Sequence, residues 1–567
     1  MRHRIIRLSI IGTLAFAGVS CQPDVLDVQP KVLVSDIAVQ PAEVTVREGE
    51  TIHLEAAVTP ADASDKRVDW STDNEKVAVV DAGGLVTAVS VGVARITATA
   101  RDGGRSSFCK VTVRTASSPL PSGREWPDTG ADVPAWPDYQ AVSALEDFPR
   151  IDIRTDSGQP VKSHTTYEGG TISFSDPKQM YSEVTSLKDL KMKIRGRGNT
   201  TWEGQWGAKN PYRIKLDEHV KPFGMRGDKD WILLSDRLDP SLMRTVVALR
   251  ISRLVSMPWT PRFRMAEVYL NGSYAGLYYL VEQKEPDREN KVPITVAVPG
   301  ETENGGYLLE LDNKWDEDAY FTSATFRKMV KFKHPDPNDT DVAKRMTVEQ
   351  KAYITGYFNT VEKKLANREF DGAEGYKSYI EMDSWIQNFF VHELSMNIDG
   401  NMRLSTYFAK DRDTKLFMPF VWDFDRAFGN ASYQKGDFDL TQSWPYGWFV
   451  RIRGGYPDSE SSSLYRKGKQ PSWYQYLFED PEFVDRVKEL WDLYRPRLDM
   501  IPEFMDKMLE YNRLALKHND TKFQNDAERR IQTLRKDYLT RLNWLDLNIR
   551  SLQPQRYNPE TGRFEDL

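Results

Sequence analysis

Cysteine is scarce in this chain of 567 residues, which contains only Cys21 and Cys109. Two cysteines allow at most one disulfide, and none can form within the chain if Cys21 is modified, so stability has to come from burial of apolar surface. Positive charge is not in excess either, because 77 basic residues stand against 83 acidic ones, with a formal net charge of -6. A chain without a broad basic field is not expected to bind nucleic acid.

Long apolar runs are missing beyond the start of the chain. The run over residues 8–19 follows three arginines and ends in small residues before Cys21. At about a dozen residues it is too short to span a bilayer, and we expect residues 1–20 to be a removable signal peptide. Residues 18–24 resemble a lipoprotein signal, which implies a lipid on Cys21 and a membrane-anchored protein of the cell envelope, periplasmic or surface-exposed. Ordinary cleavage and secretion is the alternative.

Residues 33–114 alternate apolar and polar positions in short runs separated by glycine pairs. This pattern predicts strands joined by turns and therefore an all-β sandwich. The segments 68–72, 77–81 and 84–88 resemble the bacterial Ig-like group 2 family. Trp70 lies in the first of them, and we expect it to anchor the core rather than to form a ligand platform.

The length of the chain predicts at least one further domain, because a single core stops growing at roughly 250–300 residues. Residues 115–144 are rich in proline and predict a stiff linker. Residues 145–555 mix strand and helix patterns, which indicates an α+β domain with a helical C-terminal part over 472–553. Strands are expected at 190–194, 212–216, 266–270, 277–281 and 307–311, with a hairpin turn at Asn271-Gly272, and helices around 241–256, 347–366 and 382–395.

Three motifs in the large domain could carry chemistry. The first is the basic, glycine-rich segment 195–202, followed by the lysine-containing strand pattern 209–216. Glycine lets backbone amides approach a ligand closely, and guanidinium groups match phosphate oxygens, so an anion site is one interpretation. A solvated basic turn is the other. The segment is not a Walker loop, because no Gly-Lys-Ser or Gly-Lys-Thr closes it.

The second motif is Asp423 and Asp425, which follow the apolar run 416–421. A strand that delivers alternate carboxylates into a loop places oxygen ligands for a divalent cation, most naturally magnesium, at its end. The third motif, 397–401, follows an expected helix and contains Asp399. A carboxylate there could accept a proton from an incoming hydroxyl group, or the segment could be only a helix-terminating turn.

The order of these motifs is the order found in kinases, namely a loop over the phosphates, a strand lysine, a catalytic-loop aspartate and a metal-binding aspartate. The segments 195–202, 209–215, 271–282 and 422–429 together resemble the CotH (spore coat protein H) kinase family. That resemblance implies an atypical protein kinase-like fold that uses ATP and a divalent metal, here Mg²⁺, to phosphorylate Ser and Thr residues of extracytoplasmic proteins.

The resemblance also assigns roles to residues of this chain. Asp399 would be the catalytic carboxylate, and Asp423, with Asp425 as a helper, would bind the metal. Family members often carry a His-Asn pair after the catalytic aspartate, whereas this chain has Gly400-Asn401, so Asn401 is the closest substitute for a second metal ligand. The expected nucleotide contacts are Lys215, Arg197, Asn199 and Glu282, the last as the ion-pair partner of Lys215.

Two other functions fit the same residues. One is a catalytically inactive surface binding or adhesion protein, with the Ig-like module as a spacer. The other is transfer of a different group from a nucleotide. A convergence of Asp399, Asp423 and Lys215 at one site would favour the kinase. The identity of the protein substrate does not follow from the sequence.

Overall fold

The structure is a computed structural model that describes residues 31–47, 49–90, 92–114, 141–198, 201–202, 209–235, 237–286, 291–295, 303–312, 318–341, 344–372, 374–400, 402–430, 444–450, 473–558 and 563–567. The chain divides into two compact units, residues 1–122 and residues 123–567. Cys21, Asn199 and Asn401 lie outside the described residues.

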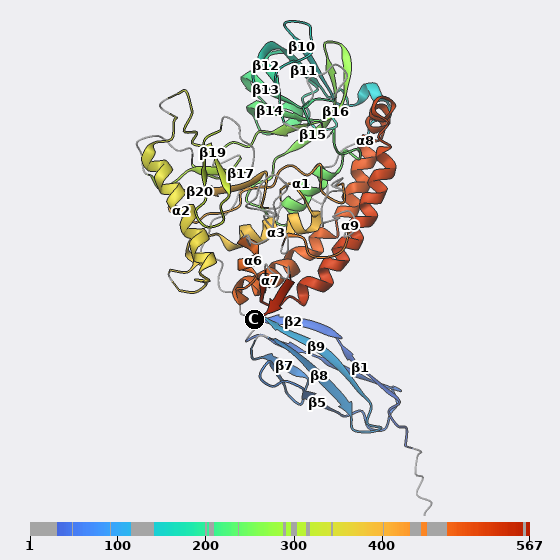
Figure 1. Ribbon diagram of the computed structural model, residues 1–567. Helices are drawn as coiled ribbons and strands as arrows, with labels where there is room; N and C mark the ends of the chain where they lie inside the picture. The colour runs from blue at the N-terminus through green and yellow to red at the C-terminus, as the bar shows by residue number, and fades with distance from the viewer. Residues whose placement is uncertain are drawn as a thin grey trace, which may run out of the picture. The chain divides into compact units, whose positions relative to one another are not determined.

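The first unit is the predicted β-sandwich (Figure 1). Its sheets are β2-β9-β8-β5, β3-β7-β6 and the pair β1-β4, and β2 runs parallel to β9. Inward-facing side chains such as Ile96 and Val111 are fully buried, and Cys109 lies among them as a free thiol. The strands are β1 Asp36–Gln40, β2 Glu43–Arg47, β3 Thr51–His53, β4 Glu55–Thr59, β5 Val68–Thr72, β6 Ala78–Val80, β7 Leu85–Ala88, β8 Gly92–Ala100 and β9 Ser106–Arg114.

The second unit begins with a closed β-barrel in the order β10-β11-β12-β13-β14-β16-β15, in which β10 pairs parallel with β15 and closes the ring (Figure 1). Alternate side chains, including Ile214 and Trp231, fill the interior. Asn271 and Gly272 both have positive φ, as a two-residue hairpin turn requires, which confirms the predicted turn. The strands are β10 Arg150–Thr155, β11 Glu168–Ser175, β12 Ser186–Gly196, β13 Tyr212–Val220, β14 Asp228–Leu234, β15 Phe263–Leu270 and β16 Ser273–Glu282.

A second, four-stranded sheet, β18-β19-β17-β20, follows in the chain, with the long helix α2 beside it (Figure 1). The predicted helices at 241–256, 347–366 and 382–395 are confirmed, as is the helical C-terminal part. These elements are α1 Arg244–Leu254, β17 Tyr307–Leu311, β18 Tyr320–Thr322, β19 Met329–His334, α2 Val348–Ala366, α3 Met382–Ser395, β20 Thr406–Lys410, α6 Trp473–Leu477, α7 Pro481–Leu498, α8 Ile501–Phe523, α9 Ala527–Arg550, β21 Gln555–Asn558 and β22 Arg563–Asp566.

Helix α3 is the centre of this unit, since nearly all of its side chains are buried and it contacts α1, α7 and α9. Glu393 on α3 forms a salt bridge of 2.7 Å with Arg541 on α9, and both side chains are almost fully buried. The two oxygens of Glu393 also accept hydrogen bonds from the backbone N–H groups of Phe449 and Val450. Glu393 therefore connects α3, α9 and the segment 449–450.

Candidate active site

Asp399 and Asp423 lie on two loops that are connected by hydrogen bonds of one buried side chain, Asn397. Helix α3 ends at Ser395, and the left-handed backbone of its C-cap, Met396, turns the chain into the loop that carries Asp399. The side-chain amide of fully buried Asn397 donates to the backbone carbonyl of Asp423 at 2.9 Å, and its carbonyl oxygen accepts from the backbone N–H of Asp399 at 3.1 Å. The structure thus brings the second and third sequence motifs together.

The carboxylate of Asp399 is oriented by a neighbour in its own loop. Arg403 donates to Asp399 Oδ1 at 3.1 Å and to the backbone carbonyl of Ile398 at 2.7 Å. Both side chains of this ion pair are mostly buried, with 11% of Arg403 and 16% of Asp399 exposed. A carboxylate fixed in this way remains available to an approaching hydroxyl through its exposed part.

The loop can close onto α3 because residue 400 is glycine. A Cβ atom on Gly400 would lie 2.6 Å from Cε1 of His392 and 2.8 Å from the amide nitrogen of Asn397. The buried His392 ring stacks on Phe424 at 5.2 Å, and burial lowers the pKa of His392 to about 3. His392 therefore supports the loop as a neutral side chain at neutral pH.

Asp423 adopts φ +70°, in the left-handed region that Asp and Asn tolerate better than most residues. The hydroxyl of Ser405 lies 3.4 Å from its Oδ2, so the carboxylate faces the end of the Asp399 loop. Asp425 is buried, and its backbone carbonyl accepts from the side chain of Asn430 at 2.6 Å. No cluster of three or more His, Cys, Asp or Glu side chains suited to a metal occurs in the described part of the chain.

Two cations lie near Asp423 and contact the neighbouring tryptophan. Cζ of Arg197 is 5.7 Å from the centre of a Trp422 ring, and Nζ of Lys284 is 4.2 Å from it. Burial lowers the pKa of Arg197, while the charge of Asp423 acts in the opposite direction. Within the described residues, the Arg197 guanidinium forms no salt bridge. The Arg197 guanidinium is partly removed from water, and an incoming anion would replace the interactions with water that it has lost.

Lys215 and Glu282 do not form the expected ion pair, and the sheet register explains why. On β14, Trp231 pairs with Ile214 and Glu282, whereas the adjacent Asp230 pairs with Lys215. Side chains alternate between the two faces of a strand, so Lys215 and Glu282 point to opposite faces.

The partners that the two residues have instead agree with this register. Glu282 is fully buried and binds Arg226 at 2.7 Å and the backbone N–H of Arg262 at 2.8 Å. Lys215 is 44% exposed and lies 4.0 Å from Asp230. Neither of these contacts belongs to the site around Asp423.

Lys284 was not predicted as a site residue from the sequence, although it lies only two residues beyond Glu282. Lys284 follows β16 and donates a hydrogen bond of 2.6 Å to the hydroxyl of Tyr407 on β20. Burial lowers the pKa of Lys284 to about 7. The signal in the sequence was a lysine two residues after an apolar strand, and a lysine there is also typical of a strand end exposed to solvent.

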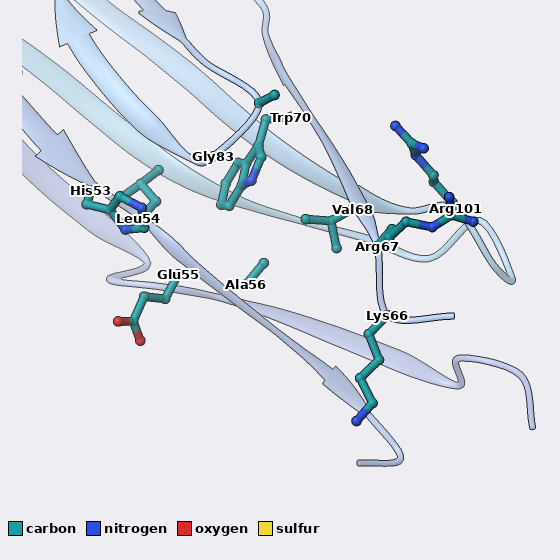
Figure 2. Close-up of a pocket in the computed structure, with 11 residues that line it drawn as sticks. His53, Leu54, Glu55, Ala56, Lys66, Arg67, Val68, Trp70, Gly83 and Arg101 are labelled. Atoms are coloured by element: carbon teal, nitrogen blue, oxygen red, sulfur yellow. The ribbon is translucent and has the colours of Figure 1, made fainter. Parts of the chain in front are cut away.

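The Ig-like unit contains a separate feature, an open hollow of about 560 Å³ (Figure 2). Trp70 packs against the sandwich core but also lines this hollow, so it is only partly the buried anchor that was expected. Its ring lies over Gly84, where a Cβ atom would come within 3.0 Å. Arg67 and Arg101 at the rim are paired with Asp65 and Asp69. The hollow is open and both of its arginines are already paired, so it does not define a binding site.

The architecture defines a modular protein, in which an Ig-like β-module is followed by a larger mixed α/β domain with a helical C-terminal part. Residues 194–545 match the family model for CotH kinase protein, and residues 33–111 match the bacterial Ig-like domain (group 2). The chain belongs to the CotH kinase family. No helix in the described residues is long and apolar enough to cross a membrane.

Individual relatives are similar to small parts of the chain. A 3-O-α-D-galactosyl-α-L-arabinofuranosidase of Bifidobacterium longum is 41% identical over 87 residues, 15% of this chain and 8% of the relative. A kappa-carrageenase of Pseudoalteromonas carrageenovora is 35% identical over 82 residues, 14% of this chain and 21% of the relative. The chain thus spans less than a quarter of the length of these curated relatives.

Solved structures give a similarly local match. Domains 5–6 of the S-layer protein SbsC share 16% identity over 32% of this chain and 91% of that chain, with a TM-score of 0.14. A GH10 xylanase from termite gut that contains a bacterial Ig-like domain shares 22% identity over 18% of this chain and 23% of that chain, with a TM-score of 0.11.

Proposed function

We propose that this member of the CotH family is a metal-dependent protein kinase that uses ATP to phosphorylate Ser or Thr hydroxyl groups of extracytoplasmic proteins. The observation that carries the proposal is the bridge through Asn397, which holds the loops of Asp399 and Asp423 together. Positioning and charge stabilisation do most of the work in phosphoryl transfer, so such a rigid pair of carboxylate loops suits the reaction.

Each charged group has a distinct part in this proposal. Asp399, oriented by Arg403, would accept the proton of the incoming hydroxyl group. Asp423, with Asp425 nearby in sequence, would hold the divalent cation. Arg197 would neutralise phosphate oxygens with a guanidinium group that has no carboxylate bound to it in the described residues.

The residues fit a nucleotide with magnesium on two grounds. Magnesium keeps several waters and is usually held by one or two carboxylates together with phosphate oxygens, so a three-residue protein cluster is not needed. Two partly buried cations beside Asp423 provide the complementary charge for phosphate groups. When bound, ATP supplies the phosphoryl group and Mg²⁺ neutralises its charge.

We also propose that the protein works in the cell envelope, anchored through a lipid on Cys21. The cationic and apolar start of the chain supports export, and the small residues before Cys21 support lipid attachment. Metabolic labelling with a fatty acid analogue tests this point, because Cys21→Ser would abolish the label if Cys21 is the acceptor. Retention of the label in that variant would contradict lipid attachment at Cys21.

The function is tested by calorimetric titration of ATP into the full-length protein, with and without magnesium. Asp423→Asn is the informative variant, because Asn tolerates φ +70° and lacks only the charge. We expect magnesium-dependent binding in the wild type, its loss in Asp423→Asn and its retention in the control Asp62→Asn, which alters an exposed residue of the Ig-like unit. Failure of the wild type to bind would instead favour a surface-binding protein without kinase activity.

A further inference from the structure

Three polar side chains from three separate segments form a hydrogen-bonded chain that ends beside Asp423. Nζ of Lys284 donates to the hydroxyl oxygen of Tyr407 at 2.6 Å, and the Tyr407 hydroxyl donates in turn to Oε1 of Glu310. Glu310 lies on β17 directly opposite Tyr407 on β20, so the sheet register fixes this second contact. The other oxygen of Glu310 lies 3.5 Å from Lys333 on β19.

In this chain of contacts the Lys284 ammonium group is bonded to a hydroxyl group and not directly to a carboxylate of the described residues. Lys284 forms no salt bridge with the described residues, and its close contacts are the Tyr407 hydroxyl and the rings of Tyr407 and Trp422. The charges that act on it are Glu310 and Asp423, which favour its protonated form, and Arg197 and Lys333, which oppose it. An ammonium group has three donors, and Tyr407 occupies one of them.

Arg197 and Lys284 approach the same tryptophan from two different barrel strands. Arg197 directly follows β12, and Lys284 lies two residues after the end of β16. Both are close enough to Asp423 for its charge to favour their charged forms. The charge of Asp423 thus acts on both cations, and a phosphate group with its own cation would complement these three charges.

We propose that Lys284, held in place by Tyr407 and Glu310, is the lysine that contacts the phosphate oxygens of the nucleotide. This inference rests on the proposed kinase function and replaces Lys215 in the role that the sequence suggested. A tyrosine stands between the lysine and its carboxylate, so Lys284 is oriented without being neutralised by direct contact. Lys284 is a binding residue in this scheme, and Tyr407 and Glu310 are positioning residues.

Chemical labelling of the wild-type protein tests the inference without a variant. Burial lowers the pKa of Lys284 to about 7, so its amine should react readily with acetic anhydride at pH 8. We expect ATP with magnesium to slow acetylation of Lys284 at least tenfold and to leave exposed Lys193 unchanged, as read by mass spectrometry of peptides. Protection of Lys215 in place of Lys284 would overturn the inference.

Binding measurements on variants provide the second arm. We expect Lys284→Met to weaken ATP binding at least tenfold, Lys284→Arg to restore part of it and Lys193→Met to match the wild type. Tyr407→Phe should weaken binding severalfold, because it removes the contact that orients Lys284. If the wild type binds ATP and Lys284→Met binds equally well, the inference fails alone. If the wild type binds no nucleotide, the proposed kinase function fails as well.

Discussion

The side-chain amide of Asn397 is hydrogen-bonded to the backbone carbonyl of Asp423 at 2.9 Å, across two loops that are separate in the sequence. The same side chain accepts from the backbone N–H of Asp399. Because Asn397 is fully buried, neither contact can be replaced easily by water. This amide therefore contributes directly to the relative position of the two loops, together with the contact of Ser405 with Asp423.

Asn397→Ala should lower both stability and ATP-dependent activity. Loss of two buried hydrogen bonds leaves backbone groups unsatisfied, with an expected cost of about 2–4 kcal/mol. Urea denaturation measures the stability, and phosphate transfer to a generic protein substrate measures the activity. Asn367→Ala is the matched control, because that exposed amide donates a hydrogen bond to Glu369 and its loss should change stability little. Equal stability of the two variants would contradict the role of Asn397.

The same glycine-to-alanine change should have opposite effects at two positions. Gly400→Ala places a Cβ atom 2.6 Å from the His392 ring and should destabilise the protein by about 1–3 kcal/mol. Gly356→Ala lies in α2 with open space around it, and should stabilise by about 0.4–1 kcal/mol. Thermal unfolding of both variants beside the wild type checks the signs. A stable Gly400→Ala protein would show that the loop is not packed against α3.

Glu393→Gln should be strongly destabilising. The change leaves Arg541 buried beside a neutral group, and breaking such a buried pair costs about 3–5 kcal/mol. The exposed pair of Lys507 and Glu510 is the comparison, because Glu510→Gln should cost less than about 1 kcal/mol. Both values can be measured by urea denaturation, and a loss below about 1 kcal/mol for Glu393→Gln would contradict the structure.

His392 should make stability fall with acid. Burial lowers its pKa to about 3 in the folded protein, while an unfolded histidine titrates near pH 6.5. Below that value the unfolded chain binds the extra proton, so stability falls as the pH drops from about 6.5 toward 3, by roughly 1 kcal/mol per pH unit.

His392→Gln is expected to reduce this dependence, measured as unfolding free energy between pH 5 and 7. Burial also lowers the pKa of His334, to about 4, so part of the slope should remain in the variant. His53→Gln, at an exposed site of the Ig-like unit, is the control and should keep the full slope. An unchanged slope in His392→Gln would mean that His392 is not buried as a neutral side chain.

Local patterns predicted most elements of the fold but not their closure into a barrel. The alternation over 212–216 and the Asn271-Gly272 turn have signals within a few residues, and both are confirmed. The parallel pairing of β10 with β15 joins segments that are far apart in the sequence, and no short pattern encodes it. The strands were therefore predictable individually, whereas their order around the ring was not.

At the candidate site, too, residues with a local sequence signal could be predicted, whereas residues that depend on tertiary contacts could not. Asp399 could be named because it follows a predicted helix, and Asp423 because it follows the apolar run 416–421. That run is not the expected strand, since only Leu416 and Phe417 form isolated bridges in it. Lys215 was a reasonable choice from its strand, but the face of a strand depends on register, which the sequence does not display. Lys284 becomes visible only when β16 and β20 are brought together, since its contact with Tyr407 is a tertiary one.

The closed barrel also limits how another polypeptide can be recognised. A ring of paired strands leaves no exposed edge whose backbone groups could pair with an added strand. Docking by sheet extension, which many peptide-binding domains use, is therefore closed to this part of the molecule. Under the proposed kinase function, recognition of a protein substrate by the barrel would therefore depend on the side chains of its surface and not on pairing with its backbone.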